Sequence, residues 1–275
     1  MTTVTLPDQL PDQLLGQLAD IERYYDAVPR PVATTEEVGP FTLFLAGAGT
    51  GWEFYARPRL GLDEPVTADD VRAVFDRQFE LDRPRNIEWV DETTPSLLPA
   101  VRTALGSAAS AGAHVELEQC PLLVLPTGAS AGEPDARTRV LTADDPDLAI
   151  TVGVVHAGFD GSDDVIERPV GKRPELIDQG LLVVVAAYDD HGRVLGGGSA
   201  APRGDAAELM GIGVPPFARR RGLGSAITRA LVRAVRDRGV ATVLLSAASD
   251  RAASIYRQVG FEDVGTACIL ELHSG

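Results

Sequence analysis

The first apolar pattern along the chain has the spacing of a helix. Apolar positions three or four residues apart share one helix face, and proline ends such a run. We therefore expect a helix that runs towards Tyr25, stops before Pro29 and packs on the domain that follows. Its apolar positions are Leu10, Leu14, Leu15, Leu18 and Ile21.

Strand-like and helix-like patterns then alternate up to residue 125. Thr67 and Asp70 have the spacing of a capping box, which predicts a helix over 68–82. The glycines at 47–51 predict a turn between two strands. The remaining expected elements are strands at 41–46, 52–57, 86–90 and 114–125, and a helix at 96–109.

A segment rich in Pro, Gly, Ser and Ala, 126–136, has no apolar periodicity and predicts a domain boundary. We expect an N-terminal part, 1–137, and a C-terminal domain, 138–275. In the latter, Thr142 and Asp145 predict a second capping box and a helix towards His156. The other expected elements are a hairpin over 181–200, strands at 208–214, 240–245 and 268–272, and helices from 223 and over 250–258.

The segment from 208 to 245 indicates the fold class. Leu223, Ile227 and Leu231 lie on one face of its helix, and Arg229 and Arg236 lie on the opposite face. A strand, a helix and a strand joined by one crossover predict a parallel pair. We expect an α/β (α+β) fold with a mixed central sheet flanked by helices.

Composition places the chain among ordinary globular proteins: 275 residues, 44% of them hydrophobic, with a net charge of −15. No stretch reaches roughly 18 unbroken apolar residues and residues 1–10 lack a signal pattern, so we expect a cytoplasmic protein without membrane contact. The acidic balance argues against nucleic acid as a partner and suits an amine substrate. Oligomeric state is left open, with a homodimer among the alternatives.

Neither the cysteines nor the histidines have the spacing of a metal site, so no metal is expected. Cys120 and Cys268 each lie in a strand-like segment and are expected to be buried free thiols. The histidines, to which no role is assigned, are His114, His156, His191 and His273.

The loop between the expected strand 208–214 and the helix from 223 has the features of a phosphate site. Glycines let a ligand approach the main chain, and a helix start offers unpaired N–H groups and the positive end of a dipole. Three successive arginines at 219–221 add positive charge. The loop lacks the Lys-Ser/Thr pair of a Walker motif and the third small residue of a dinucleotide fingerprint.

Arg219-x-x-Gly222-x-Gly224 after this strand resembles the acetyl-CoA signature of the GNAT superfamily of N-acyltransferases. Ala252-x-x-Ile255-Tyr256-x-x-x-Gly260-Phe261 is similar to a second block of that superfamily. The resemblance covers roughly residues 139–272. It implies a GNAT-like fold with acetyl-CoA as co-substrate and a small-molecule or peptide amine as acceptor.

The resemblance also assigns roles to individual residues. Tyr256 would protonate the departing thiolate, and Glu208 would be the general base. Ser249 stands where many members carry Asn, which puts one cofactor contact in question. The main chain of Ile212, Gly213 and Val214 would pair with the pantetheine arm, and the pyrophosphate would bind to the loop residues Arg219, Arg220, Arg221, Gly222, Leu223, Gly224 and Ser225.

The N-terminal part is similar in element order to the end of the C-terminal domain. A shift of 148 residues places Cys120 on Cys268 and Gly112 on Gly260. We interpret this part as a smaller GNAT-like domain without a cofactor loop, because Asp69 and Asp70 carry negative charge where a pyrophosphate would bind. An unrelated α+β domain is the alternative.

Three functions remain open from the sequence. The first is an N-acetyltransferase that acts by direct attack in a ternary complex. The second is a CoA-binding regulatory or partner-binding module without turnover. The third is a transfer of longer acyl or aminoacyl groups on the same scaffold.

Overall fold

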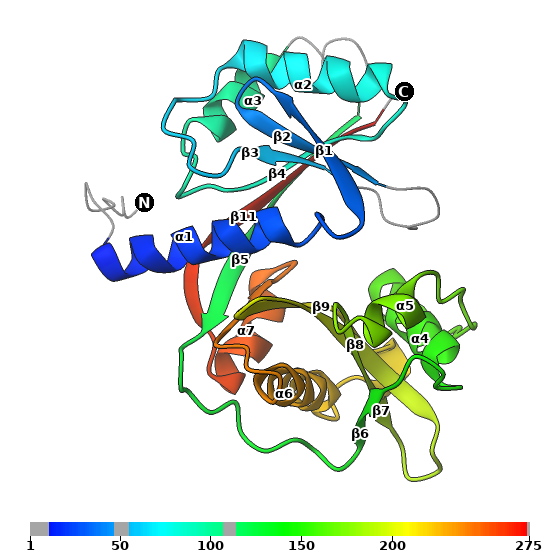
Figure 1. Cartoon of the computed structure of the whole chain (residues 1–275). Helices are drawn as coiled ribbons and strands as arrows, with labels where there is room; N and C mark the ends of the chain where they lie inside the picture. The colour runs from blue at the N-terminus through cyan, green and yellow to red at the C-terminus, as the bar shows by residue number, and fades with distance from the viewer. Residues whose placement is uncertain (1–10, 47–54, 107–113, 274–275) are drawn as a thin grey trace, which may run out of the picture.

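The computed structural model describes residues 11–46, 55–106 and 114–273. These residues form an 11-stranded mixed sheet with helices on its faces, in the order β1-β2-β3-β4-β11-β5-β10-β9-β8-β7-β6 (Figure 1). The predicted α/β class with a mixed central sheet is confirmed. Among the described residues, no helix has the length and apolar character that crossing a membrane requires.

The first half supplies the elements up to residue 125. They are α1 (Asp12–Ala27), β1 (Ala33–Val38), β2 (Phe41–Ala46), β3 (Ala56–Pro58), α2 (Ala68–Glu80), β4 (Arg85–Val90), α3 (Leu97–Leu105) and β5 (His114–Leu125). The expected turn at 47–51 lies outside the described residues. Strand β1 was not predicted, because its sequence ATTEEV is polar and none of its residues is fully buried.

The second half supplies the rest. Its elements are β6 (Thr138–Leu141), α4 (Leu148–Asp160), α5 (Arg173–Asp178), β7 (Val183–Tyr188), β8 (Val194–Arg203), β9 (Ala206–Gly213), the short 3-10 helix η2 (Pro216–Ala218), α6 (Leu223–Arg236), β10 (Thr242–Ser246), α7 (Asp250–Val259) and β11 (Glu262–His273). Strand β6 and helix α5 were not predicted. The predicted parallel pair around α6 is confirmed, since β9 and β10 run parallel.

The two halves repeat one topology. In each, an antiparallel three-stranded unit (β1–β3 and β7–β9) is followed by a helix, a strand parallel to the third, a second helix and a long strand. The two long strands, β5 and β11, are related by the 148-residue shift, which carries 114–125 onto 262–273.

The long strands are exchanged between the halves. β5 lies between β11 and β10, and β11 lies between β4 and β5. The boundary at 137/138 stays a prediction, and this exchange means that each half completes the sheet of the other. The predicted buried free thiols are confirmed on this pair of strands, at Cys120 and Cys268.

Helix α1 lies across the junction of the two halves (Figure 1). Its buried residues Leu18, Ile21, Tyr24 and Tyr25 join a cluster with residues of β4, β5, β9, β10 and β11. The expectation that this helix packs on the domain that follows it was therefore incomplete. It brings two tyrosines of the first half to the middle of the sheet.

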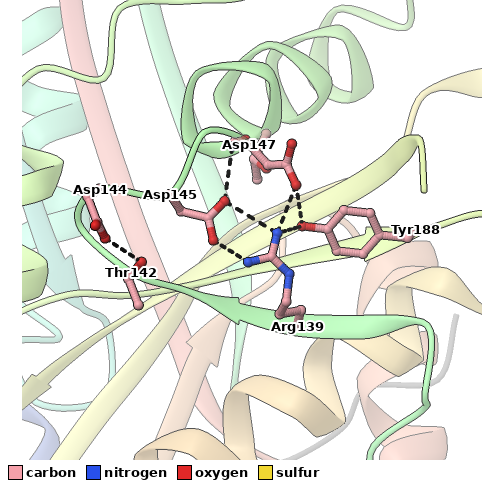
Figure 2. A network of polar contacts seen from close by, with 7 residues as sticks. Arg139, Thr142, Asp144, Asp145, Asp147 and Tyr188 are labelled. Carbon is pink, nitrogen blue, oxygen red and sulfur yellow. Dashed lines mark hydrogen bonds and ion pairs between the residues drawn. The ribbon is translucent and has the colours of Figure 1, made fainter.

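The second capping box was a wrong prediction. Helix α4 begins at Leu148, and its N-cap Asp147 makes no side-chain capping hydrogen bond. Asp145 instead forms an ion pair with Arg139 of β6, which also contacts Asp147 and the hydroxyl of Tyr188 (Figure 2). The carboxylates thus join the edge strand to the start of α4 rather than capping a helix turn.

The segment 126–137 contains no helix or strand and runs along α6. Arg229 donates a hydrogen bond of 2.9 Å to the carbonyl of Ala131, and Arg236 donates to the carbonyl of Ala129. The apolar face of α6, with Leu223, Ile227 and Leu231, is buried against the sheet. The predicted arginine face therefore anchors the connecting segment.

Candidate acyl-transfer site

Strands β9 and β10 separate at the centre of the candidate site. They pair only from Thr242–Ala206 to Leu244–Glu208, so β9 continues from Leu209 to Gly213 without β10 beside it. A bulge at Gly211, whose φ is 59°, shifts the pairing of this stretch with β8. The main chain of Ile212 to Val214 thus extends along an opening between the two parallel strands, the stretch to which the GNAT resemblance assigns the pantetheine arm.

Helix α6, which follows, begins without a side-chain cap. Its N-cap residue is Gly222, with φ of 74°, which has no side chain to accept a hydrogen bond. The first N–H groups of a helix have no acceptor within it, and they carry the positive end of the helix dipole. Gly224 and Ser225 are half-buried in this first turn. A β-carbon on Gly224 would meet only Ile255 Cγ2, at 3.9 Å, so the fold itself leaves room there.

The three arginines before Gly222 differ in their contacts. Arg219 donates to the carbonyls of Val214 at 2.9 Å and Gly158 at 2.7 Å, which closes the loop onto the end of α4. Arg221 donates to the Phe217 carbonyl at 3.2 Å. Arg220 has φ of 61°, and all three arginines are exposed. Arg219 therefore shapes the loop, and Arg220 adds positive charge at its surface.

Glu208 is the last β9 residue that pairs with β10. Its carboxylate accepts a 3.1 Å hydrogen bond from the Tyr25 hydroxyl and interacts with Ser246 at the end of β10. The Tyr24 hydroxyl accepts from the Glu208 main-chain N–H at 2.9 Å. Burial raises the pKa of the Glu208 carboxyl to about 7. A carboxylate with this pKa can take a proton near neutral pH.

Behind Tyr25 lies a charged network from the first half. The Arg57 guanidinium stacks 4.2 Å from the centre of the Tyr25 ring. It also lies 3.5 Å from a carboxylate oxygen of Glu22 and 3.6 Å from one of Glu88. Burial raises the pKa of Glu88 to about 7 as well. Glu88 and Glu208, the two carboxyl groups with raised pKa values, thus both lie within the electrostatic influence of buried Arg57 at the junction of the halves.

Tyr256 lies on α7, half-buried against the core of the second half and edge-on to Phe261, with ring centres 6.3 Å apart. Burial raises the pKa of its hydroxyl, so the hydroxyl stays protonated at neutral pH. Ser249 has a structural role: it is the N-cap of α7 and accepts from Ala252 N at 3.2 Å. Its cofactor contact stays a prediction.

The structure brings the predicted residues of strand β9 and loop 219–225 together at the opening between β9 and β10. Sequence reasoning missed Tyr25, Arg57 and Glu88. They come from three separate elements of the first half, and no motif links them to Glu208, 120 to 183 positions away. A lone tyrosine on an apolar helix face is typical of core packing, so only the fold could reveal this contact.

Comparisons with known proteins agree with this geometry. Residues 159–261 match the sequence model of the acetyltransferase (GNAT) family. They include the loop 219–225 and all of α7. The match decides the family of this region. Residues 159–261 are a GNAT domain.

A mycothiol acetyltransferase from Rhodococcus erythropolis is 42% identical over 67 residues. The match spans 22% of this chain and 22% of the relative's length. The whole fold resembles a GCN5-related N-acetyltransferase from Kribbella flavida, with a TM-score of 0.68 and 19% identity over 94% of this chain and 95% of the other. A GCN5-related N-acetyltransferase-like protein from Streptococcus suis has a TM-score of 0.58 and 13% identity over 94% of this chain and 100% of the other. These likenesses extend the GNAT fold assignment across both halves.

Proposed function

We propose that this chain transfers an acetyl group from acetyl-CoA to an amine of a small-molecule or peptide acceptor. The observation that carries the proposal is the position of Glu208. A carboxyl group with a pKa of about 7 lies where β9 and β10 separate, and the uncapped start of α6 follows on the same strand–helix connection.

In the proposed reaction, acetyl-CoA lies along Ile212 to Val214, and its pyrophosphate accepts hydrogen bonds from the main chain of 220–225. Several charge-assisted hydrogen bonds to a helix start suit a pyrophosphate, which carries negative charge on adjacent groups. The glycines at 222 and 224 allow the close approach. No metal is needed in this arrangement, because the helix dipole and Arg220 supply the positive charge.

The chemical step needs a neutral nitrogen. Glu208 takes a proton from the acceptor ammonium, directly or through a water, and the freed lone pair attacks the thioester carbon. The tetrahedral intermediate then collapses, the carbon–sulfur bond breaks, and CoA leaves as a thiolate. The hydroxyl of Tyr256 gives its proton to this thiolate to yield the free thiol, and the tyrosinate takes up the second proton, which the nitrogen loses as the amide forms.

The first half contributes to the same site in this account. Tyr25 orients the Glu208 carboxylate, and Arg57 with Glu22 and Glu88 holds Tyr25 in place. Acidic groups at the junction of the halves suit a cationic acceptor. The partial likeness to a mycothiol acetyltransferase puts the acceptor of that enzyme on the list of amines to try.

The test is CoA release from acetyl-CoA with a panel of amines, for the wild-type chain and for Glu208→Gln. We expect kcat/KM to rise with pH through about 7 in the wild type, because the base acts when deprotonated. Loss of a general base lowers the rate by about 10²–10⁴-fold. A Glu208→Gln variant with unchanged rate and pH profile would remove Glu208 from the mechanism. Acetyl-CoA binding without turnover of any amine would favour the regulatory module.

A further inference from the structure

Four side chains with metal-binding atoms meet where β5 begins and β11 ends. In the antiparallel ladder, Glu116 lies opposite Glu271 and His114 lies opposite His273. Residues two apart on a strand point to the same face, and directly opposite residues share it. The pattern His-x-Glu on one strand and Glu-x-His on the other therefore places two imidazoles and two carboxylates side by side.

Three of them, Glu116, Glu271 and His273, each offer a donor atom within 4.8 Å of those of the other two, and His114 adjoins this group through Glu116. His114 Nε2 lies 3.3 Å from Glu116 Oε1. His273 Nε2 lies 3.5 Å from Glu271 Oε2 and 3.8 Å from Glu116 Oε2. Ligand atoms about 2.0–2.2 Å from a tetrahedral zinc ion are roughly 3.3–3.6 Å from one another. The two imidazole rings stack with centres 5.8 Å apart, so both reach the same side of the carboxylates.

A neighbouring residue adds an independent observation. Asn86 of β4 lies opposite Glu271 on the side away from Glu116. Its Oδ1 atom is buried and has no hydrogen-bond partner among the described residues. Asn86, Glu271 and His273 line one hollow, together with Asp82, Arg83 and Arg85. Buried polar atoms are nearly always paired, so this oxygen points to a missing partner such as a metal-bound water.

We propose that Glu116, Glu271 and His273 bind one divalent transition-metal cation of the zinc class, and that His114, 3.3 Å from Glu116, turns in as the fourth ligand. Two imidazoles and two carboxylates form a mixed nitrogen and oxygen set, which suits Zn²⁺ better than Mg²⁺ or Ca²⁺, whose ligands are oxygens. His114, Glu116 and His273 are exposed, and two arginines line the hollow beside Glu271 and His273, of which Arg85 stacks on Phe79. Binding is therefore expected in the micromolar range rather than tighter.

This site would join the two strands that the halves exchange. The start of β5 belongs to the first half and the end of β11 to the second, and a cation would cross-link them 157 positions apart in sequence. Val124 of β5 lies in the same row of the sheet as Glu208. Glu116 is eight positions before Val124 on this strand, so the cation site is about 26 Å from the row of Glu208. The cation would stabilise the fold without entering the acyl-transfer chemistry.

The experiment uses full-length protein that has been treated with EDTA and dialysed. Calorimetric titration with ZnCl₂ should give one site per chain, and the melting temperature should rise with Zn²⁺ but not with Mg²⁺, as expected when a ligand binds the folded state alone. Co²⁺ should give the visible absorption of a tetrahedral site.

The double variant His114→Ala, His273→Ala should bind Zn²⁺ at least about tenfold more weakly and lose the thermal shift. Glu271→Gln should act in the same direction. His191→Ala, at an exposed histidine in the β7–β8 turn, is the control and should bind as the wild type does. The proposal fails if the wild type takes up no stoichiometric Zn²⁺, or if the double variant binds it equally well with the wild-type circular dichroism spectrum.

Discussion

The helix starts of α2 and α6 occupy equivalent places in the two halves, each after the third strand of its unit. At α2, Thr67 and Asp70 form a complete capping box: the Thr67 hydroxyl accepts from Asp70 N at 3.3 Å, and Asp70 accepts from Thr67 N at 2.9 Å. At α6, Gly222 offers no side chain. At the start of α2 a side chain of the protein accepts from a main-chain N–H group, whereas the first N–H groups of α6 are available to a ligand.

The second residue of each helix also differs between the two halves. It is Asp69 in α2 and Gly224 in α6. A carboxylate at the start of α2 stabilises the helix through the dipole and repels a phosphate. A glycine at the start of α6 admits one. The same topology thus yields a capped scaffold in one half and a candidate anion site in the other, and a few residues decide which.

The largest effect after loss of Glu208 should come from Tyr256→Phe. Without a hydroxyl donor the thiolate leaves less readily, and we expect kcat to fall by about 100-fold, at the lower end for a lost general acid, with acetyl-CoA binding unchanged. Thr103→Val, which also removes one hydroxyl but on the exposed face of α3, is the control and should leave kcat unchanged. Single-turnover kinetics check this; a normal kcat for Tyr256→Phe would confine that ring to packing.

Glu208→Gln should also stabilise the protein at alkaline pH. Burial raises the pKa of this carboxyl to about 7. The native state therefore holds a proton that the unfolded state has lost above about pH 4.3, and stability declines as pH rises through about 7. We expect a gain of about 1–3 kcal/mol at pH 8 and little change at pH 4, measured by urea denaturation. Equal effects at both pH values would contradict the link to Glu208 ionisation.

Tyr25→Phe tests whether the first half takes part in the site. The Tyr25 hydrogen bond favours the charged carboxylate and lowers the pKa of Glu208. Its removal should move the rise of kcat/KM to higher pH, by about half to one pH unit, while acetyl-CoA binding stays the same. Tyr55→Phe is the comparison variant, because the Tyr55 ring centre lies 5.9 Å from the same Arg57 guanidinium. A pH profile that does not move would separate Tyr25 from Glu208.

The smallest effect should come from the capping box. Thr67→Ala removes one hydrogen bond at the start of α2 and should cost about 0.5–2 kcal/mol of unfolding free energy. It should not alter catalysis or create a second acetyl-CoA site, because Asp69 and Asp70 remain. Denaturation and stoichiometry measurements check the two parts of this expectation.

Much of the fold could be predicted because its local signals are strong. The apolar face of α6, the capping box of α2 and the alternation in β5 each specify one element by periodicity or hydrogen bonding. The edge strands β1 and β6 were missed because exposed edges need no apolar alternation. Thr142 and Asp145 have the spacing of a capping box, but the Asp145 carboxylate pairs with Arg139 of β6 instead of capping a helix.

Part of the candidate site could likewise be predicted from the sequence, and part could not. The loop 219–225 is contiguous, so its glycines and arginines are visible in the sequence. Tyr25 and Arg57 reach Glu208 only because α1 crosses the junction and β5 and β11 are exchanged. Likewise, His114 and His273 become neighbours through the β5–β11 ladder. Contacts that depend on this exchange have no signature along the chain.

The central claim is that acetyl-CoA binds at the start of α6 and not at the start of α2. Isothermal titration of acetyl-CoA should give one site per chain in the wild type and in Asp69→Val. In Gly224→Val, where a β-carbon has room in the fold, binding should weaken by at least about 100-fold through lost charge-assisted hydrogen bonds. Two sites per chain, or equal binding by Gly224→Val and the wild type, would contradict the account.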